Sequence, residues 1–142
     1  MALHPHVQKR AQIAIDRIVA EEHRLPTFED QEKLPYVTAI VLEGLRWSPV
    51  APFSIYHVAG KEGEPYCGYR IPKDAIIIPN LWAVLRDERL FGKDPAKFMP
   101  ERFMMSVGEG EEEQLKADVT SADMAFGFGR RICPGKRELL WK

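Results

Sequence analysis

The stretch Phe126-Gly127-Phe128-Gly129-Arg130-Arg131-Ile132-Cys133-Pro134-Gly135 carries the most specific pattern in the chain. Glycines on both sides of Cys133 indicate a backbone that approaches a flat or bulky group, because glycine has no Cβ atom. Pro134 is expected to start a helix, which would place the sulfur near free N–H groups and favour the thiolate. In an extended ribbon the side chains of Arg131 and Cys133 would leave on one face, about 7 Å apart. A metal-bound thiolate beside a cation for a carboxylate would fit this spacing.

Other interpretations of the same stretch remain open on the residues alone. A free cysteine is most often a small buried hydrophobic residue, and Cys133 could be one. A phosphate-binding glycine loop would need its third glycine where Ile132 stands. A zinc site would need a second Cys or His ligand at short spacing, which the sequence does not have.

Composition excludes several functional classes. The chain has 142 residues, 45% of them hydrophobic and 29% charged, which is typical of one modest globular domain at most. With 20 basic and 21 acidic residues its net charge is −1, so we expect no nucleic-acid partner. Its 2 cysteines lie in different contexts and indicate a reducing compartment rather than a disulfide scaffold. No apolar run reaches the roughly 20 residues of a membrane-spanning helix, so no span is expected in this chain.

Helical spacing of apolar residues predicts two helices, each with a proline in its first turn. They run from Pro5 to Glu22 and from Pro35 to Trp47. Between them, Thr27 is expected to cap a short helix with acidic residues in its first turn. The second helix is predicted to be mostly buried.

The chain after these helices is predicted to form strands and loops. Short β-like runs, separated by turn residues, predict a small antiparallel sheet from Phe53–Ala59, Tyr66–Ile71 and Ala75–Pro79. A short helix is expected over Asn80–Arg86, followed by a long ordered, non-regular loop from Asp87 to Met105. The acidic stretch Gly108–Glu113 is typical of a solvated loop.

Two shorter motifs lie upstream of the cysteine: Glu43-Gly44-Leu45-Arg46 and Pro100-Glu101-Arg102-Phe103. Glu43 and Arg46 are three residues apart on the second predicted helix, so they share one of its faces. An exposed surface pair is the simplest interpretation. A guanidinium that binds a carboxylate through two hydrogen bonds would also suit a rigid polar clamp in a core.

The cysteine stretch fills every fixed position of Phe-x-x-Gly-x-Arg-x-Cys-x-Gly, with Phe126, Gly129, Arg131, Cys133 and Gly135. It resembles the haem-binding loop of the cytochrome P-450 family, the haem-thiolate monooxygenases. The resemblance implies that Cys133 is the ligand of the haem iron and that Arg131 pairs with a haem propionate. It also implies that Phe126 packs beside the cysteine, while Gly129 and Gly135 leave room for the porphyrin.

The shorter motifs match the same family in order and in separation. Glu43 and Arg46 occupy its Glu-x-x-Arg motif, and the resemblance implies that Arg102 closes a buried structural network with them. His57 resembles a family position that contacts a haem propionate; a satisfied, half-buried histidine is the alternative. The basic residues Arg130, Lys136 and Arg137 are expected either to dock an acidic reductase or to form a solvated cationic edge.

The resemblance covers about residues 4–135, so residues 1–142 are expected to form a partial cytochrome P-450 domain, closest to eukaryotic, fungal microsomal members. The implied fold class is α+β, mainly helical: the C-terminal part of that fold, with helices, a small antiparallel sheet, a long ordered loop and the cysteine loop. Family members are several times longer, and their oxygen-activating helix has no counterpart here. No catalytic residue is therefore expected within this chain.

The function implied for the family is insertion of one oxygen atom from O2 into an apolar small molecule. The cofactor would be haem b, and an NADPH-dependent reductase would supply the electrons. Full-length relatives would lie at the endoplasmic reticulum membrane. This chain, without an anchor, is expected to be cytoplasmic and inactive alone. A non-catalytic haem-binding remnant or an interaction fragment is the alternative.

Overall fold

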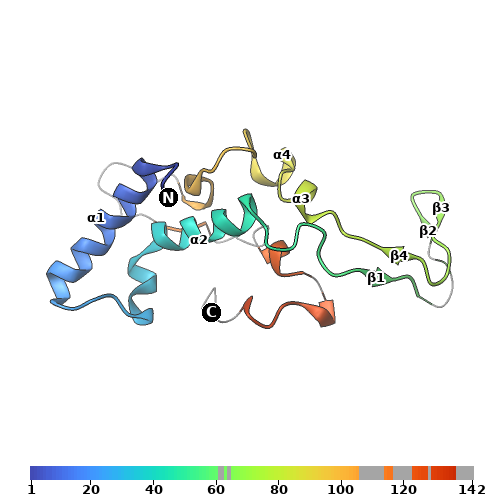
Figure 1. Cartoon of the computed structure of the whole chain (residues 1–142), viewed down its shortest axis with the longest axis horizontal. Coiled ribbons are helices and arrows are strands. Elements are labelled where there is room, and N and C mark those ends of the chain that lie inside the picture. Colours follow the sequence, from blue (N-terminus) through green and yellow to red (C-terminus); the bar gives the residue numbers. More distant parts are fainter. Residues whose placement is uncertain (61–62, 64, 106–113, 117–122, 128, 137–142) are drawn as a thin grey trace.

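A computed structural model describes residues 1–60, 63, 65–105, 114–116, 123–127 and 129–136 of the chain. It consists of a helical body and a narrow arm of paired strands that extends from one side of it (Figure 1). The expected acidic loop at Gly108–Glu113 lies outside the described residues. The α+β, mainly helical architecture predicted from the sequence is confirmed.

Two helices dominate the body, and both were predicted to the residue. Helix α1 spans Pro5–Glu22 and helix α2 spans Pro35–Trp47, each with proline in its first turn. Proline fits there because its missing N–H would have no partner within the helix. Helix α1 ends where His23 takes a left-handed backbone conformation with φ 52°.

The corner between these helices is built around one buried carboxylate. The 3-10 helix η1, Phe28–Lys33, begins after Thr27, where a short helix was predicted. Within it the Asp30 carboxylate, 2% exposed, accepts two hydrogen bonds from Arg24 at 2.7 and 3.0 Å. It also accepts the Thr27 backbone N–H at 2.8 Å. These donors, Arg24 foremost, hold the pKa of Asp30 well below its usual range.

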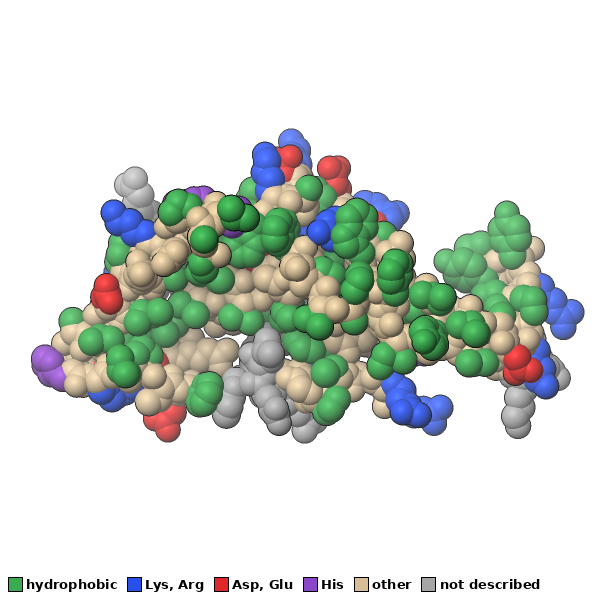
Figure 2. Space-filling model, in the orientation of Figure 1, with side chains coloured by type: hydrophobic (Ala, Val, Ile, Leu, Met, Phe, Trp, Pro, Cys, Tyr) green, Lys and Arg blue, Asp and Glu red, His purple; other side chains and the backbone are tan. Residues whose placement is uncertain are grey.

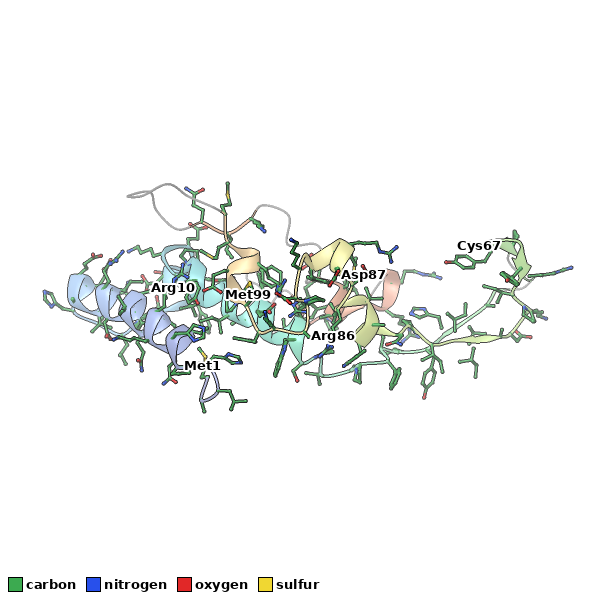
Figure 3. All side chains as sticks on the ribbon, turned by 90° about the horizontal axis from the view of Figure 1, so that it is seen from above. Met1, Arg10, Cys67, Arg86, Asp87 and Met99 are labelled. Carbon is green, nitrogen blue, oxygen red and sulfur yellow. The ribbon has the colours of Figure 1, made fainter. Side chains whose placement is uncertain are left out.

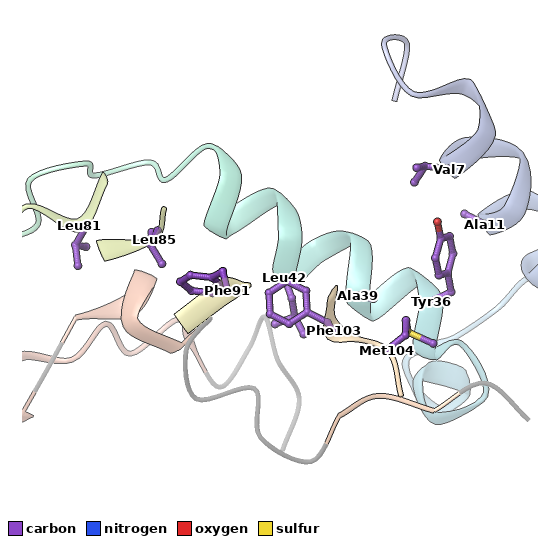
Figure 4. Close-up of a cluster of buried hydrophobic side chains, with 10 residues drawn as sticks. All are labelled: Val7, Ala11, Tyr36, Ala39, Leu42, Leu81, Leu85, Phe91, Phe103 and Met104. Carbon is purple, nitrogen blue, oxygen red and sulfur yellow. The ribbon is translucent and has the colours of Figure 1, made fainter. Parts of the chain in front are cut away.

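Helix α2 lies at the centre of the hydrophobic core. The 3-10 helix η2, Pro100–Phe103, packs against it, and α1 covers its N-terminal part. The buried side chains of this cluster, drawn in Figure 4, are Val7, Ala11, Tyr36, Ala39, Leu42, Leu81, Leu85, Phe91, Phe103 and Met104. They follow α2 along its length, so this one helix joins the N-terminal segment to residues 81–104.

A polar contact strengthens the joint between α1, α2 and η2. The Tyr36 hydroxyl donates to the Glu101 carboxylate at 2.7 Å, and Arg10 donates to the same oxygen at 2.9 Å. The Arg10 guanidinium also lies over the Tyr36 ring, 3.8 Å from its centroid. Burial, together with the adjacent Glu101 carboxylate, raises the pKa of Tyr36 to about 12. Tyr36 therefore stays a neutral donor.

The arm differs from the single small sheet that was expected, because its strands form two separate two-stranded ladders. Strand β1, His57–Val58, pairs antiparallel with β4, Ile76–Ile77; β2, Pro65–Tyr66, pairs antiparallel with β3, Tyr69–Arg70. Cys67 and Gly68 form the turn between β2 and β3, both with positive φ, at 48° and 82°. Such a two-residue turn matches the twist of a hairpin and fixes this pairing locally. Figure 3 shows Cys67 at the far end of the arm.

Residues of the arm are exposed rather than packed into a core. Ile55, Tyr56, Val58 and Ile76 are between 65% and 67% exposed. Figure 2 shows hydrophobic side chains over the arm as well as over the body. An apolar surface of this kind is typical of a segment that other protein covers.

Helix α3, Leu81–Val84, confirms the short helix predicted over Asn80–Arg86. The segment after it, Asp87 to Met105, was expected to be non-regular but contains helix α4, Glu88–Phe91, and η2, which corrects that prediction. Asn80 and Asp87 cap the two helices, with side-chain oxygens that accept backbone N–H groups at 3.1 and 2.8 Å. Side-chain caps of this kind stabilise single turns that propensity alone does not predict.

We predict that Asp30→Asn destabilises the chain at neutral pH and that its effect fades in acid. The folded state keeps this carboxylate ionised to lower pH than the unfolded chain does. Its contribution is therefore complete above about pH 4 to 5 and is lost as the pH falls further. Melting midpoints from circular dichroism, measured from pH 2.5 to 7, would show the gap between wild type and variant closing in acid. Asp16→Asn, on the exposed side of α1, is the matched control; an equal gap at every pH would contradict the prediction.

Candidate functional site

Helix α2 carries a buried ion pair, Glu43 with Arg46. Glu43 and Arg46 are both 0% exposed, and Arg46 donates two hydrogen bonds to the carboxylate, from Nε at 2.6 Å and from a terminal nitrogen at 2.8 Å. Arg46 donates further to the backbone carbonyls of Leu85, at 2.7 Å, and Lys97, at 3.2 Å. The last two hydrogen bonds join α2 to the segment that follows the arm.

Arg102 completes this network from η2. Its Nε donates to Glu43 at 3.2 Å, and its terminal nitrogens donate to the carbonyls of Phe91, Asp94 and Lys97. The Met99 backbone N–H donates to the same Glu43 oxygen at 2.7 Å. The structure thus brings together the three charged residues singled out from the sequence. It adds the backbone partners that the sequence could not indicate.

The Cys133 loop begins at Met124 and Ala125, which pack against the hydrophobic core, and then turns back on itself. Its first turn is the 3-10 helix η3, Met124–Phe126, and its second is η4, Gly129–Arg131. Gly127 and Gly129 both have positive φ, 83° and 62°, which side chains disfavour. The Cys133 N–H then donates to the Phe126 carbonyl at 2.8 Å, so the loop closes on the residue where its motif begins.

Cys133 itself is a free, exposed thiol. A Cβ atom added at Gly135 would lie 3.6 Å from its sulfur, in ordinary contact with it. Glycine at this position therefore leaves the space beside the sulfur open. A Cβ atom added at Gly129 would meet nothing within 4 Å, so its backbone is equally accessible to a flat ligand.

One detail of the loop differs from expectation. Arg131 belongs to the turn η4 rather than to an extended ribbon, so the predicted same-face geometry with Cys133 is wrong. Pro134 and Gly135 form a turn in which the Lys136 N–H donates to the Cys133 carbonyl at 3.2 Å. Whether the expected helix continues from there depends on residues outside the described part. Arg131 remains exposed, with its guanidinium open to an anionic partner.

The remaining candidate residues differ in how far their side chains are buried. Phe126 is half-buried at the end of η3, and His57 is exposed on β1. Among the described residues no hydrogen bond or ion pair joins His57 to the Cys133 loop. Lys136, considered as a docking residue from the sequence, instead binds Asp123 at 2.9 Å. That pair had no sequence signal, because its partners are thirteen positions apart.

The donor set around Cys133 limits what it could bind. Within the described part of the chain, no group of three or more His, Cys, Asp or Glu side chains could hold a metal ion. A metal at this thiol would therefore need most of its ligands from a cofactor, as haem iron does from its porphyrin. The open glycine backbone and exposed Arg131 fit a flat, anionic group of that kind.

No helix among the described residues is long and apolar enough to cross a membrane.

Comparison with known proteins identifies the family of the chain. The family model for cytochrome P-450 matches residues 1–137. The chain belongs to the cytochrome P-450 family. It is 46% identical, over 99% of its length, to the cytochrome P-450 monooxygenase eriA of Hericium erinaceus. Over 96% of its length it is 47% identical to the monooxygenase COX2 of Coprinopsis cinerea and 46% identical to ppsD of Aspergillus oryzae.

This P-450 chain spans about a quarter of the length of the relatives that it matches: 26% of eriA and 24% of COX2 and ppsD. It is accordingly a partial P-450 domain. Membership of the family implies a haem cofactor and, in general, a reductase as redox partner. The buried ion pairs of Glu43 join helix α2 to residues 85–102.

We predict that Glu43→Ala prevents stable folding of the P-450 domain. The test protein is a chimera in which this chain replaces the matching quarter of eriA. Removing the carboxylate leaves Arg46 and Arg102 buried without a counterion, at a cost of roughly 3–5 kcal/mol. Soluble yield and urea unfolding would measure the loss.

Arg89→Ala is the matched control for that variant. Arg89 also binds a carboxylate, Asp87, but its side chain is 88% exposed. Exposed ion pairs contribute roughly 0–1 kcal/mol, so this change should leave yield and unfolding almost unaltered. A soluble Glu43→Ala chimera with the unfolding curve of the parent would refute the structural role of the network.

Proposed function

We propose that this chain supplies the thiolate side of the haem site of a cytochrome P-450 monooxygenase, with Cys133 as the protein ligand of the iron of haem b. The supporting observation is the free Cys133 thiol, exposed on a glycine-lined loop that closes through the Phe126 carbonyl. A structural cysteine would be expected to lie inside the hydrophobic core. This one is outside the core cluster and is available to a ligand.

The proposal gives a role to each of the other candidate residues. Arg131, an exposed cation two residues before the thiol, would bind a haem propionate through its planar guanidinium. His57, exposed on β1, would bind the other propionate. Gly129 and Gly135 would let the porphyrin approach the backbone, and Phe126 would shield the sulfur on one side.

The loop also controls the electronic character of the thiolate. Backbone N–H groups near a ligating sulfur withdraw charge from it, and the Gly135 N–H, in the turn that follows Cys133, would be such a group. When bound, haem supplies the chemistry that reduces dioxygen and cleaves its O–O bond, which a thiolate ligand favours. The residues of this chain would ligate the iron through the Cys133 sulfur and bind the propionates.

Electrons and substrate reach the site through other parts of the system. We propose an NADPH-dependent reductase as the electron donor, with the protein at the endoplasmic reticulum membrane, and an apolar small molecule as the substrate. Arg130 is exposed on η4 and remains a candidate contact for an acidic reductase surface. By itself, this quarter of a P-450 is proposed to lack turnover, since it supplies one side of the haem site.

The ligand assignment is tested by Cys133→Ser in the eriA chimera. The parent should show the thiolate-type Soret band in its ferrous carbon-monoxide complex, and the variant should lose it, because a neutral hydroxyl is a poor iron ligand. Cys67→Ser is the matched control: Cys67 is the other free cysteine, exposed in the arm, and should leave the band intact. A thiolate band retained by Cys133→Ser would overturn the proposal.

Haem titration of the 142-residue chain distinguishes the remaining alternative. We expect no turnover with a reductase and weak binding, since the chain presents half of the haem-contact surface at most. Tight binding of one haem per chain without turnover would instead identify a haem-binding remnant. That result would leave the Cys133 assignment in place and would contradict the expected weak binding.

A further inference from the structure

An ion pair joins the two ends of the Cys133 loop. The Lys136 ammonium lies 2.9 Å from the Asp123 carboxylate oxygen Oδ2, across thirteen positions of sequence. The two side chains are 30% and 26% exposed, so the contact is largely shielded from water. Such pairs resist screening by salt better than fully exposed ones do.

The ends of the loop differ in how they are fastened to the body. Asp123 directly precedes Met124 and Ala125, which pack against the hydrophobic core cluster. Cys133 is exposed and lies outside that cluster. Among the described residues, the contacts between the anchored end and the cysteine end are the hydrogen bond from Cys133 to Phe126 and the Asp123–Lys136 pair.

The environment of Asp123 makes it depend on the lysine. Its second oxygen, Oδ1, is shielded from solvent and has no hydrogen-bond partner among the described residues. A partly buried carboxylate with one unpartnered oxygen is held in place by its counterion, because losing that counterion leaves an uncompensated charge. Lys136 therefore contributes more here than a lysine at the surface.

We propose that Asp123 and Lys136 form a clasp that positions the Cys133 sulfur for the haem iron. Asp123 is anchored beside the core, and Lys136 lies three residues after Cys133. The ion pair between them therefore fixes the position of Cys133 relative to the core. Both are positioning residues and neither touches the iron. This inference rests on the proposed ligand role of Cys133. In this proposal Lys136 holds the loop closed by binding Asp123, and it is not a docking residue for a reductase.

The first test measures iron ligation in the eriA chimera at matched haem content. Lys136→Met and Asp123→Asn should each lower the ratio of thiolate-ligated to other haem about two- to fivefold, the scale of one partly shielded ion pair. Lys136→Arg should restore the ratio, because it keeps the charge. The double variant Asp123→Asn/Lys136→Met should lose less than the product of the single losses, since it leaves no unpaired charge.

Arg130→Met is the matched control for ligation. It removes the same charge from the same loop, at an exposed side chain on η4, and should leave the ratio of haem forms unchanged. A merely structural role would lower total yield without altering this ratio. Equal ratios in the parent, Lys136→Met and Arg130→Met would overturn the inference, as would additive losses in the double variant.

A second measurement uses the intact 142-residue chain without haem. Asp123→Asn keeps every tryptic site, so cleavage after Arg130 and Arg131 reports directly on how open the loop is. We expect that cleavage to rise about two- to fivefold, while cleavage after Lys93 stays constant. No change at Arg130 and Arg131 would refute the clasp.

The two proposals fail in different ways. If Cys133→Ser keeps the thiolate band, the ligand assignment is wrong, whatever the tryptic result. If Cys133→Ser loses the band and Lys136→Met keeps the parent ratio, the ligand assignment holds and the clasp does not position it.

Discussion

The body of this P-450 chain depends on one carboxylate. Glu43 accepts hydrogen bonds from Arg46, Arg102 and the Met99 N–H, all within 3.2 Å. Arg46 and Arg102 in turn bind carbonyls between residues 85 and 97. Buried charges are costly to desolvate, so they persist where, as here, each is paired and hydrogen-bonded. Helix α2, the segment after the arm and η2 are consequently fixed as a unit.

The sequence predicted those parts of the fold whose cause is local. Proline at the start and apolar residues at helical spacing defined α1 and α2 to the residue. The pairing of strands was predicted less well, because a turn at Cys67-Gly68 closes its own hairpin apart from β1 and β4. The side-chain cap at Asp87 stabilises a helical turn in a segment expected to be irregular, and propensity does not reveal it.

The same distinction applies to the site. Cys133 and the charged triad around Glu43 were recognisable from motifs, because their residue types are specific. The carbonyls that bind Arg46 were not, since any residue supplies a carbonyl. The η4 turn replaced the ribbon expected at Arg131, because Gly127 and Gly129 allow positive φ and bend the chain early. The partnership of Lys136 with Asp123 required the fold itself.

The exposed ribbon of the arm has a consequence for how this piece of protein behaves by itself. Ile76, Ile77 and Ile78 are 66%, 40% and 57% exposed, a β-branched run that could template pairing with another molecule. Pro72 and Pro79 stand at either side of the run. Because proline has no N–H to donate, each of them interrupts the backbone hydrogen bonds of an intermolecular ladder along this run. The prolines thereby disfavour self-association through residues 76–78, whose side chains stay exposed.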